Sequence, residues 1–279
     1  MSTRIKSAAV AIVIAIIMLA LHSTIVFNLA IGFISIVAIF EIFRATKMLE
    51  HKYQALACYI FAGIDAVVPY FLFNGFKAFY FFSFKFYFGI FILAMCLLYL
   101  KNHEKFNYTD FFYMTGVTML ITYSFGTLVN MAQQVKTGSL FLIVITLCGA
   151  WLADSGAYFA GTFFGKTKLC PTISPKKTVE GLIGGVVCNG IFLLIISFVY
   201  RVVLKGAEVH YIWIFLAGMA CALVGLVGDL TASIIKRQTG IKDYGNIMPG
   251  HGGIMDRFDS VLLVAPFMYY LYMQGLIFK

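Results

Sequence analysis

Apolar segments long enough to cross a lipid bilayer recur along the whole chain, and no other feature restricts the fold so strongly. A helix needs about 20 apolar residues to span a hydrocarbon core about 30 Å thick, where every backbone polar group must be satisfied internally. Only 12% of the 279 residues are charged, whereas soluble domains carry about 25%. We therefore predict an all-α fold, a polytopic integral membrane helical bundle with about nine transmembrane helices. The predicted spans are 7–22, 24–43, 55–74, 78–100, 111–131, 139–161, 182–200, 211–235 and 258–278.

Lysine and arginine are distributed unequally between the two sides of this bundle. With the N-terminus inside, fifteen of the 21 fall on the inner side, five on the outer side, and Lys85 within a span. Such a bias predicts a cytoplasmic N-terminus and an external C-terminus. We also expect the first apolar segment to be retained as a helix, because the next apolar run starts directly after His22 and Ser23.

Polar residues concentrate in the second half of the chain. Residues 1–137 consist of hydrophobic segments with short connections, and we predict that they form N-terminal transmembrane helices. Residues 138–279 hold the two longest polar connections, 165–181 and 236–257, both predicted to be cytoplasmic. We therefore predict that 138–279 is the region that carries the functional site, at the inner membrane face.

Asp154 belongs to the first group of candidate site residues. With Tyr158, Gly161 and Gly165 it follows the spacing i, i+4, i+7 and i+11, which places all four along one side of a helix. A carboxylate in an apolar helix is costly and usually faces a wet cavity or a partner. Asp154 is therefore either a ligand-binding residue or a buried structural carboxylate paired with a lysine or with Tyr158.

The connection SPKKTVEG after this helix suits a phosphate group. It supplies hydroxyls, two adjacent ammonium groups and the N-terminus of the next helix, all of which bind phosphate in proteins. Thr178 is the predicted N-cap of that helix. The alternative is that the lysines are present for membrane topology alone. The candidate substrate-binding residues here are Ser174, Lys176, Lys177, Thr178 and Glu180.

Two later helices are each expected to direct carboxylates toward the inner surface. The second of them, the last helix of the chain, is predicted to begin with MDRFDS, which places Asp256 and Asp259 one turn apart. Carboxylates from two rigid helices can hold a hard divalent cation such as Mg²⁺, which keeps several waters and also binds substrate phosphates. The other helix ends with a face formed by Asp229, Ser233, Lys236 and Arg237.

The connection between these helices adds cations and glycines. Lys242 and Arg257 can neutralise phosphate oxygens, and Gly252 and Gly253 let backbone N–H groups approach a ligand closely. His251 is either a residue that contacts phosphate or transfers a proton, or a structural hydrogen-bonding histidine.

In this region the chain resembles the phosphatidate cytidylyltransferase, or CDP-diacylglycerol synthase, family of bacterial type. The family motif is S-x-x-K-R-x4-K-D-x-G-x3-P-x-H-G-G-x-x-D-R-x-D, and the upstream segments DSGAYFAGTFFGK and SPKKTVEG also fit its pattern. Met248 is a conservative departure. The resemblance covers roughly 130 residues, while the N-terminal half matches only as a hydrophobic bundle of similar length. The motif positions are Ser233, Lys236, Arg237, Lys242, Asp243, Gly245, Pro249, His251, Gly252, Gly253, Asp256, Arg257 and Asp259.

The resemblance implies an enzyme of phospholipid biosynthesis, a nucleotidyltransferase that joins CTP and phosphatidic acid into CDP-diacylglycerol and pyrophosphate. It also implies Mg²⁺ held at the positions of Asp229 and Asp256, often with a monovalent cation such as K⁺, and a homodimer in the bacterial inner membrane with a cytoplasm-facing site. No nucleic-acid partner is expected. The expected catalytic residues are Asp229, Asp256, Lys236, Arg237, His251 and Arg257. The expected substrate-binding residues are Asp154, Ser174, Lys176, Lys177, Thr178, Glu180, Ser233, Lys242, Asp243, Gly252, Gly253 and Asp259.

Two other functions compete with this interpretation. A CTP-dependent lipid kinase of the polyprenol kinase type would use similar substrates but transfer the γ-phosphoryl group. A transporter could line its substrate path with Asp154 and Asp229, but the polar residues cluster toward one membrane side and no inverted repeat is visible. Glu41 and Asp65 in the N-terminal spans are either structural hydrogen-bonding residues or cavity-facing ones, and the sequence leaves both possibilities open.

Overall fold

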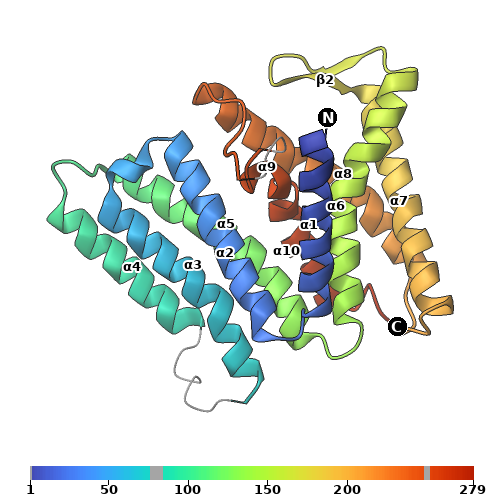
Figure 1. Ribbon diagram of the computed structural model, residues 1–279, viewed down its shortest axis with the longest axis horizontal. Coiled ribbons are helices and arrows are strands. Elements are labelled where there is room, and N and C mark those ends of the chain that lie inside the picture. The colour runs from blue at the N-terminus through green and yellow to red at the C-terminus, as the bar shows by residue number, and fades with distance from the viewer. Residues whose placement is uncertain (1, 76–83, 248–251) are drawn as a thin grey trace. The chain divides into compact units, whose positions relative to one another are not determined.

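The fold is mostly helical. The computed structural model describes residues 2–75, 84–247 and 252–279, which form ten α-helices, one 3₁₀-helix and two short strands (Figure 1). Packing divides the chain into two compact units. Unit 1 comprises Met1–Gln134 and Ile241–Arg257, and unit 2 comprises Val135–Gly240 and Phe258–Lys279. The single-turn helix α9 (Met255–Phe258) contains the last boundary between them.

Unit 1 is organised around three helices, α2, α3 and α5, that pack on one another. Asn28 of α2 is fully buried and joins all three: its amide donates to the carbonyl of Ala66 at 2.8 Å and its oxygen accepts from Gln133 at 3.0 Å. Polar side chains are used in this way between helices where the surroundings are apolar. The elements are α1 (Ser2–Ala20), α2 (Ile25–Ala45), η1 (Met48–Glu50), α3 (Lys52–Phe73), α4 (Phe84–Lys101) and α5 (Tyr108–Gln134).

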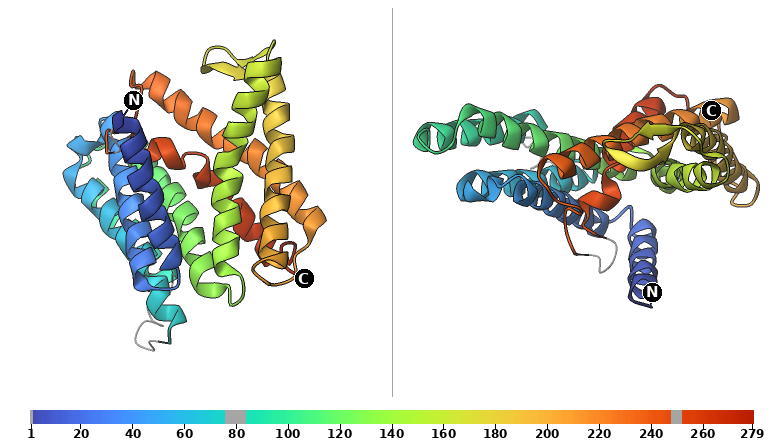
Figure 2. Two further views of the ribbon diagram at one scale, coloured as in Figure 1. Left: turned by 45° about the vertical axis from the view of Figure 1, so that its right-hand side comes forward. Right: turned by 90° about the horizontal axis from the view of Figure 1, so that it is seen from above.

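Unit 2 has a similar junction. Asn189 of α7 is fully buried and donates to the carbonyls of Gly149 on α6 at 2.9 Å and Gly218 on α8 at 2.8 Å. Figure 2 shows α6 and α7 side by side with the β1–β2 hairpin at one end. The elements are α6 (Ser139–Phe164), β1 (Lys168–Cys170), β2 (Ser174–Thr178), α7 (Val179–Val202), α8 (Tyr211–Gln238) and α10 (Val261–Met273).

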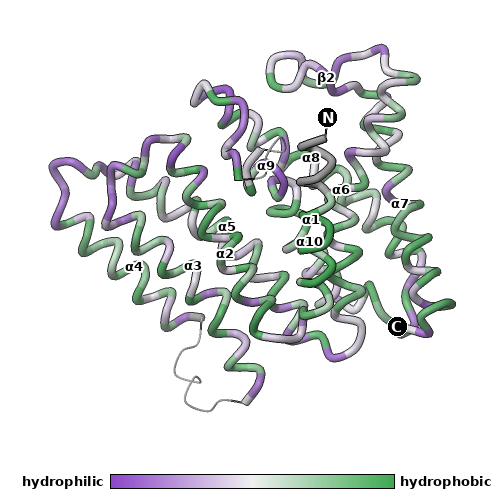
Figure 3. The backbone as a smooth tube through the Cα atoms, in the orientation of Figure 1, coloured by the Kyte–Doolittle hydropathy of each residue, from purple (hydrophilic) through white to green (hydrophobic). Residues whose placement is uncertain are grey.

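The helices have the apolar outer surface expected of a membrane bundle. Among the described residues, six helices, α2, α3, α5, α6, α7 and α8, are long and apolar enough to cross a membrane. Large apolar side chains are strongly exposed, such as Phe163 and Ile212 at 76% each, while polar residues such as Asn28 and Asn189 are buried. In Figure 3 the hydrophobic colour dominates the middle of the helices and hydrophilic segments gather at their ends and connections.

Each of the nine predicted spans overlaps a helix, but three details of the prediction are wrong. The connection 165–181 contains an antiparallel hairpin in which Lys168 faces Thr178 and Cys170 faces Ser174. A strand that reads SPKKT shows no apolar alternation, which is why the sequence does not predict it.

The last predicted span, 258–278, is not one continuous helix. The chain turns at Asp259 and Ser260 between α9 and α10, so MDRFDS does not form one helical face. Helix α10 has 13 residues and is therefore about 20 Å long, shorter than a hydrocarbon core of about 30 Å. Gly165, predicted to continue the face of Asp154, lies just beyond the end of α6 as its C-cap.

Candidate active site

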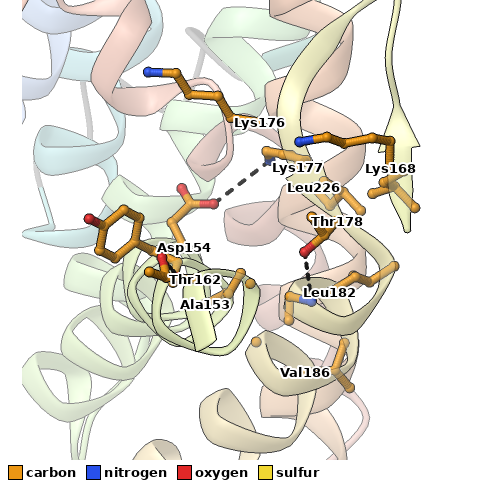
Figure 4. Close-up of a pocket in the computed structure, with 17 residues that line it drawn as sticks. Ala153, Asp154, Thr162, Lys168, Lys176, Lys177, Thr178, Leu182, Val186 and Leu226 are labelled. Carbon is orange, nitrogen blue, oxygen red and sulfur yellow. Dashed lines mark hydrogen bonds and ion pairs between the residues drawn. The ribbon is translucent and has the colours of Figure 1, made fainter. Parts of the chain in front are cut away.

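A cavity of about 430 Å³ opens in unit 2 between α6, the β1–β2 hairpin, α7 and α8 (Figure 4). Small and apolar side chains of the helices form much of its wall, among them Leu182, Val186 and Leu226. An apolar wall next to several ammonium groups suits an amphipathic anion. The polar side chains that line the cavity are Asp154, Tyr158, Thr162, Lys168, Lys176, Lys177 and Thr178.

The base of the hairpin is fixed by hydrogen bonds. Thr178 caps α7, as predicted, since its hydroxyl accepts from the backbone N–H of Gly181 at 3.1 Å. The carboxylate of Glu180 accepts from the N–H groups of Lys166 and Thr167 at distances of 3.1–3.2 Å. These contacts hold the two strands that carry the cavity lysines. The predicted role of Glu180 and Ser174 in substrate binding stays a prediction.

Lys177 joins two of the predicted carboxylates. Its ammonium nitrogen lies 2.6 Å from Oδ2 of Asp229 and 3.9 Å from Oδ1 of Asp154, and Figure 4 shows Lys177 and Asp154 pointing toward each other. The Lys177 and Asp229 side chains are 26% and 23% exposed, while that of Asp154 is 63% exposed. Asp154 is therefore paired with a lysine but is not a buried structural residue.

Asp259 adds a third carboxylate to this group. It lies in the turn before α10, outside the long apolar helices, and Gly228 of α8 lets that turn approach closely, since a Cβ at Gly228 would meet the backbone of Asp259 and Ser260. Burial raises the pKa of the Asp259 carboxyl to about 7, and the charge of Asp229 adds to the rise, whereas the Ser260 N–H and Lys236 oppose it. We call Asp154, Asp229 and Asp259 the acidic cluster. The cluster holds more negative charge than its surroundings favour.

The predicted basic residues at the end of α8 gather near the hairpin. Arg237 is exposed, and its Nε donates to the carbonyl of Ile173 in the hairpin turn at 3.4 Å. Ser233 and Lys236 are half-buried in the same last turns. Cations from two separate connections of the sequence, the hairpin and the α8 terminus, therefore lie at one end of unit 2.

In unit 1, backbone groups orient Asp256. Its Oδ2 accepts from the N–H of Tyr244 at 2.7 Å and from the N–H of Gly253 at 3.0 Å. Gly252 has φ of 85°, a conformation that favours glycine, and a Cβ there would lie 3.0 Å from the same oxygen. These glycines therefore serve the carboxylate within the chain, and their predicted approach to a ligand stays a prediction.

The two acidic residues left open by the sequence are hydrogen-bonding residues inside unit 1. Glu41 is 1% exposed and accepts from the N–H groups of Ile254 at 3.1 Å and Met255 at 2.8 Å. Asp65 is 7% exposed and accepts from the hydroxyl of Tyr87 at 3.0 Å.

The remaining candidates are surface residues or fall outside the structure. Lys242, Asp243 and Arg257 are exposed in unit 1. His251 lies outside the described residues, so both interpretations of it stay open.

Asp229 belongs to unit 2 and Asp256 to unit 1. Across residues 2–75, 84–247 and 252–279, no group of three or more His, Cys, Asp or Glu side chains could hold a metal ion. Mg²⁺ needs no such group, because it binds through one or two carboxylates together with waters and substrate phosphates. Asp229 and Asp256, each considered within its own unit, carry the hard oxygen donors that Mg²⁺ prefers.

Sequence reasoning did not select Lys168 or Tyr244, and it left the role of Glu41 open. Lys168 lines the cavity from β1, and only the strand register brings it there. Glu41 carried the signal that selected Asp154, a carboxylate in an apolar run, but no motif surrounds it. Tyr244 is 1% exposed although it lies in a polar connection, and nothing in the sequence marks it as buried.

The chain is similar to known proteins. The model of the cytidylyltransferase family matches residues 2–274. Three proteins named phosphatidate cytidylyltransferase are similar: that of Bacillus subtilis, 36% identical over 66% of this chain and 65% of its own length, that of Staphylococcus haemolyticus, 41% identical over 50% and 52%, and that of Haemophilus influenzae, 40% identical over 48% and 46%. The chain thus spans between about half and two thirds of the length of these relatives.

Proposed function

The chain belongs to the cytidylyltransferase family, and on that premise we propose that it transfers the cytidylyl group of CTP to phosphatidic acid, giving CDP-diacylglycerol and pyrophosphate. The names of the similar proteins support this choice of substrate. The proposed protein is a nucleotidyltransferase of phospholipid biosynthesis.

One observation carries the proposal most directly: Lys177, on the wall of a largely apolar cavity, lies 2.6 Å from Asp229. A lipid with a phosphate headgroup needs an apolar surface for its chains and cations for its headgroup. Lys168, Lys176 and Lys177 supply the cations, and Leu182 and Leu226 belong to the apolar wall. We therefore assign this cavity to the headgroup region of phosphatidic acid.

The two predicted metal carboxylates are Asp229 and Asp256. Bound there, Mg²⁺ would supply positive charge that neutralises the triphosphate of CTP and the developing charge on pyrophosphate. The hydrogen bonds to Asp256 from Tyr244 and Gly253 hold one carboxylate in a single orientation, as residues around a metal ligand usually do. A monovalent cation such as K⁺ is a further proposal that rests on the family resemblance.

The reaction requires positioning more than proton transfer. A phosphate oxygen of phosphatidic acid forms a bond to the α-phosphorus of CTP while the bond to pyrophosphate breaks. Because the attacking group is already an oxyanion, no general base is required. The protein must bring two polyanionic substrates together. Lys177 and Lys236, which lie near carboxylates of the acidic cluster, would reduce the repulsion between the two substrates.

We propose the same membrane arrangement that the charge distribution predicts. The six long apolar helices, together with α1, α4 and the chain from α10 to residue 278, would make nine spans, with the N-terminus and the active site cytoplasmic and the C-terminus external. A bacterial inner membrane and a homodimer follow from the family resemblance alone.

The test is an assay of the purified full chain with phosphatidic acid, Mg²⁺ and CTP labelled at the α-phosphate. The proposal expects the label in the lipid phase as CDP-diacylglycerol and release of one pyrophosphate per lipid formed. A CTP-dependent lipid kinase would instead leave the label in soluble CDP, and a transporter would consume no CTP. Either result would overturn the assignment.

A further inference from the structure

The polar segment Ile241–Arg257 of unit 1 is attached to helix α2 by two charged side chains one helical turn apart. Glu41 accepts from the N–H groups of Ile254 and Met255, and Arg44 donates to the carbonyl of Tyr244. Helix α2 therefore offers the segment an acceptor and a donor from the same face.

The carboxylate of Glu41 binds two consecutive peptide groups, one with each oxygen. Oε1 accepts from Ile254 at 3.1 Å and Oε2 accepts from Met255 at 2.8 Å. Two parallel bonds fix both the position and the rotation of those peptides. The next residue along the chain is Asp256. The contact therefore fixes the backbone directly before the proposed metal ligand.

Two glycines of the segment fit against this carboxylate. A Cβ at either Gly245 or Gly253 would overlap the carboxylate oxygens of Glu41. Gly253 also donates its N–H to Asp256 at 3.0 Å. The same peptide region therefore contacts Glu41 on one side and Asp256 on the other.

Packing alone does not explain a glutamate at position 41. It is 1% exposed within an apolar helix, where a buried carboxylate is costly and an apolar side chain of the same size would be cheaper. The two hydrogen bonds of the carboxylate explain its presence, because they fix the orientation of the peptides of Ile254 and Met255.

We propose that Glu41 is a positioning residue for the active site: it holds the first turn of α9 so that Asp256 presents its carboxylate in one orientation. The inference rests on the proposed function insofar as Asp256 is a metal ligand. Glu41 itself acts through the backbone and contacts no substrate.

The test compares Glu41→Gln with Asp65→Asn. Glutamine keeps the size of Glu41 but turns an NH₂ group toward one of the two N–H donors, so one bond is lost and two donors face each other. Asp65 is the matched control, because it is also a buried carboxylate of unit 1 but bonds to Tyr87 and not to the segment.

Hydrogen exchange of the protein without substrate gives the first readout. In Glu41→Gln we expect the peptide containing Ile254 and Met255 to exchange at least about tenfold faster, while Asp65→Asn leaves that peptide unchanged. The second readout is the Mg²⁺ titration of the assay, where Glu41→Gln should raise the half-saturating Mg²⁺ concentration about 10- to 100-fold with little change in the KM for phosphatidic acid.

A second variant carries the test if Glu41→Gln does not fold. Gly245→Ala keeps the Glu41 carboxylate but displaces it, since a Cβ at Gly245 would overlap Oε1 of Glu41, and we expect the same faster exchange and the same shift in Mg²⁺ dependence. Wild-type exchange in both variants, or a change in Asp65→Asn equal to that in Glu41→Gln, would overturn the proposal. Failure of the wild-type chain to form CDP-diacylglycerol would instead refute the proposed function, and the exchange comparison would still decide the role of Glu41.

Discussion

Two carboxylates of unit 1 and two of unit 2 are held by different kinds of group. In unit 1, Glu41 and Asp256 accept hydrogen bonds from backbone N–H groups, at 2.7 to 3.1 Å. In unit 2, Asp229 and Asp154 face the ammonium group of Lys177, at 2.6 and 3.9 Å. Glu41 and Asp256 are therefore held by groups that cannot move independently of the chain, whereas Asp229 and Asp154 face a flexible side chain.

This difference predicts different roles for the two kinds of contact. Backbone donors impose direction but no compensating charge, so they suit a carboxylate whose orientation must be kept. A lysine supplies a point charge on a flexible stem and can exchange one anion for another. Lys177 can therefore pair with a carboxylate while the cavity is empty and turn to a phosphate when substrate enters. Variants of the two groups should fail in different ways.

The largest expected effect is that of Asp229→Asn. Loss of a metal carboxylate removes several kcal/mol of transition-state stabilisation, which is about a thousandfold in rate. The fold should remain, because Asp229 is half-buried and bonded to a side chain. The measurement is transfer of label from CTP to lipid, with the thermal stability of the purified protein as a second readout.

Glu208→Gln is the matched control for Asp229→Asn. Glu208 is also in unit 2 and pairs with a cation, Arg201, at 3.0 Å, yet it belongs to no candidate site. Its activity should stay within about twofold of wild type, as is usual for exposed ion pairs. An Asp229→Asn protein with near-normal turnover at saturating Mg²⁺ would remove Asp229 from the metal site.

Asp256→Asn should lose a similar amount of activity but should also loosen the chain around it. The amide can present its NH₂ group where the carboxylate accepted from Tyr244 and Gly253, which would break one or both bonds. We expect faster hydrogen exchange in the peptides containing those two residues, and no such change in Asp229→Asn. If the two variants show equal exchange everywhere, the contrast between backbone-held and lysine-held carboxylates is not supported.

Lys177→Gln should have a smaller effect, because a charge-assisted contact to a phosphate contributes roughly 1.5 to 3 kcal/mol, about ten- to a hundredfold. The loss should appear mainly in the KM for phosphatidic acid and leave the dependence on Mg²⁺ nearly unchanged. Lys176→Gln is the comparison, since Lys176 lines the same cavity but is more exposed, and we expect about tenfold or less. An effect of Lys176→Gln larger than that of Lys177→Gln would argue against the arrangement.

Much of unit 2 could be predicted from the sequence, and the reason is local. Asp154, Thr178 and Asp229 each lie in a segment whose spacing or capping chemistry is visible within a few residues, and the N-cap at Thr178 is confirmed. The hairpin could not be predicted, since its strands lack apolar alternation and are set by contacts such as those of Glu180.

Unit 1 was harder for the opposite reason. The contact between Glu41 and Met255 joins residues 214 positions apart, and no local pattern announces it. Glycines 245 and 253 matched a family motif, but the physical reason for them, a carboxylate from α2 packed against both, appears only in the fold.

The smallest effect on activity is expected for two cysteine variants. Their labelling reports which side of the membrane each polar connection faces. Thr172→Cys lies in the hairpin turn of unit 2 and Asn246→Cys in the polar segment of unit 1, and both positions are exposed. Neither is a candidate site residue, so each variant should keep roughly normal activity. The background must lack the native cysteines, above all Cys170, which lies in β1 of the same hairpin.

CTP is a cytoplasmic nucleotide, and the lysine and arginine bias also assigns both connections to the inner side. A membrane-impermeant maleimide should therefore label neither position in intact cells and both in inverted membrane vesicles. Labelling of either position from outside would assign that connection to the outer side of the membrane and contradict the proposed cytoplasmic active site.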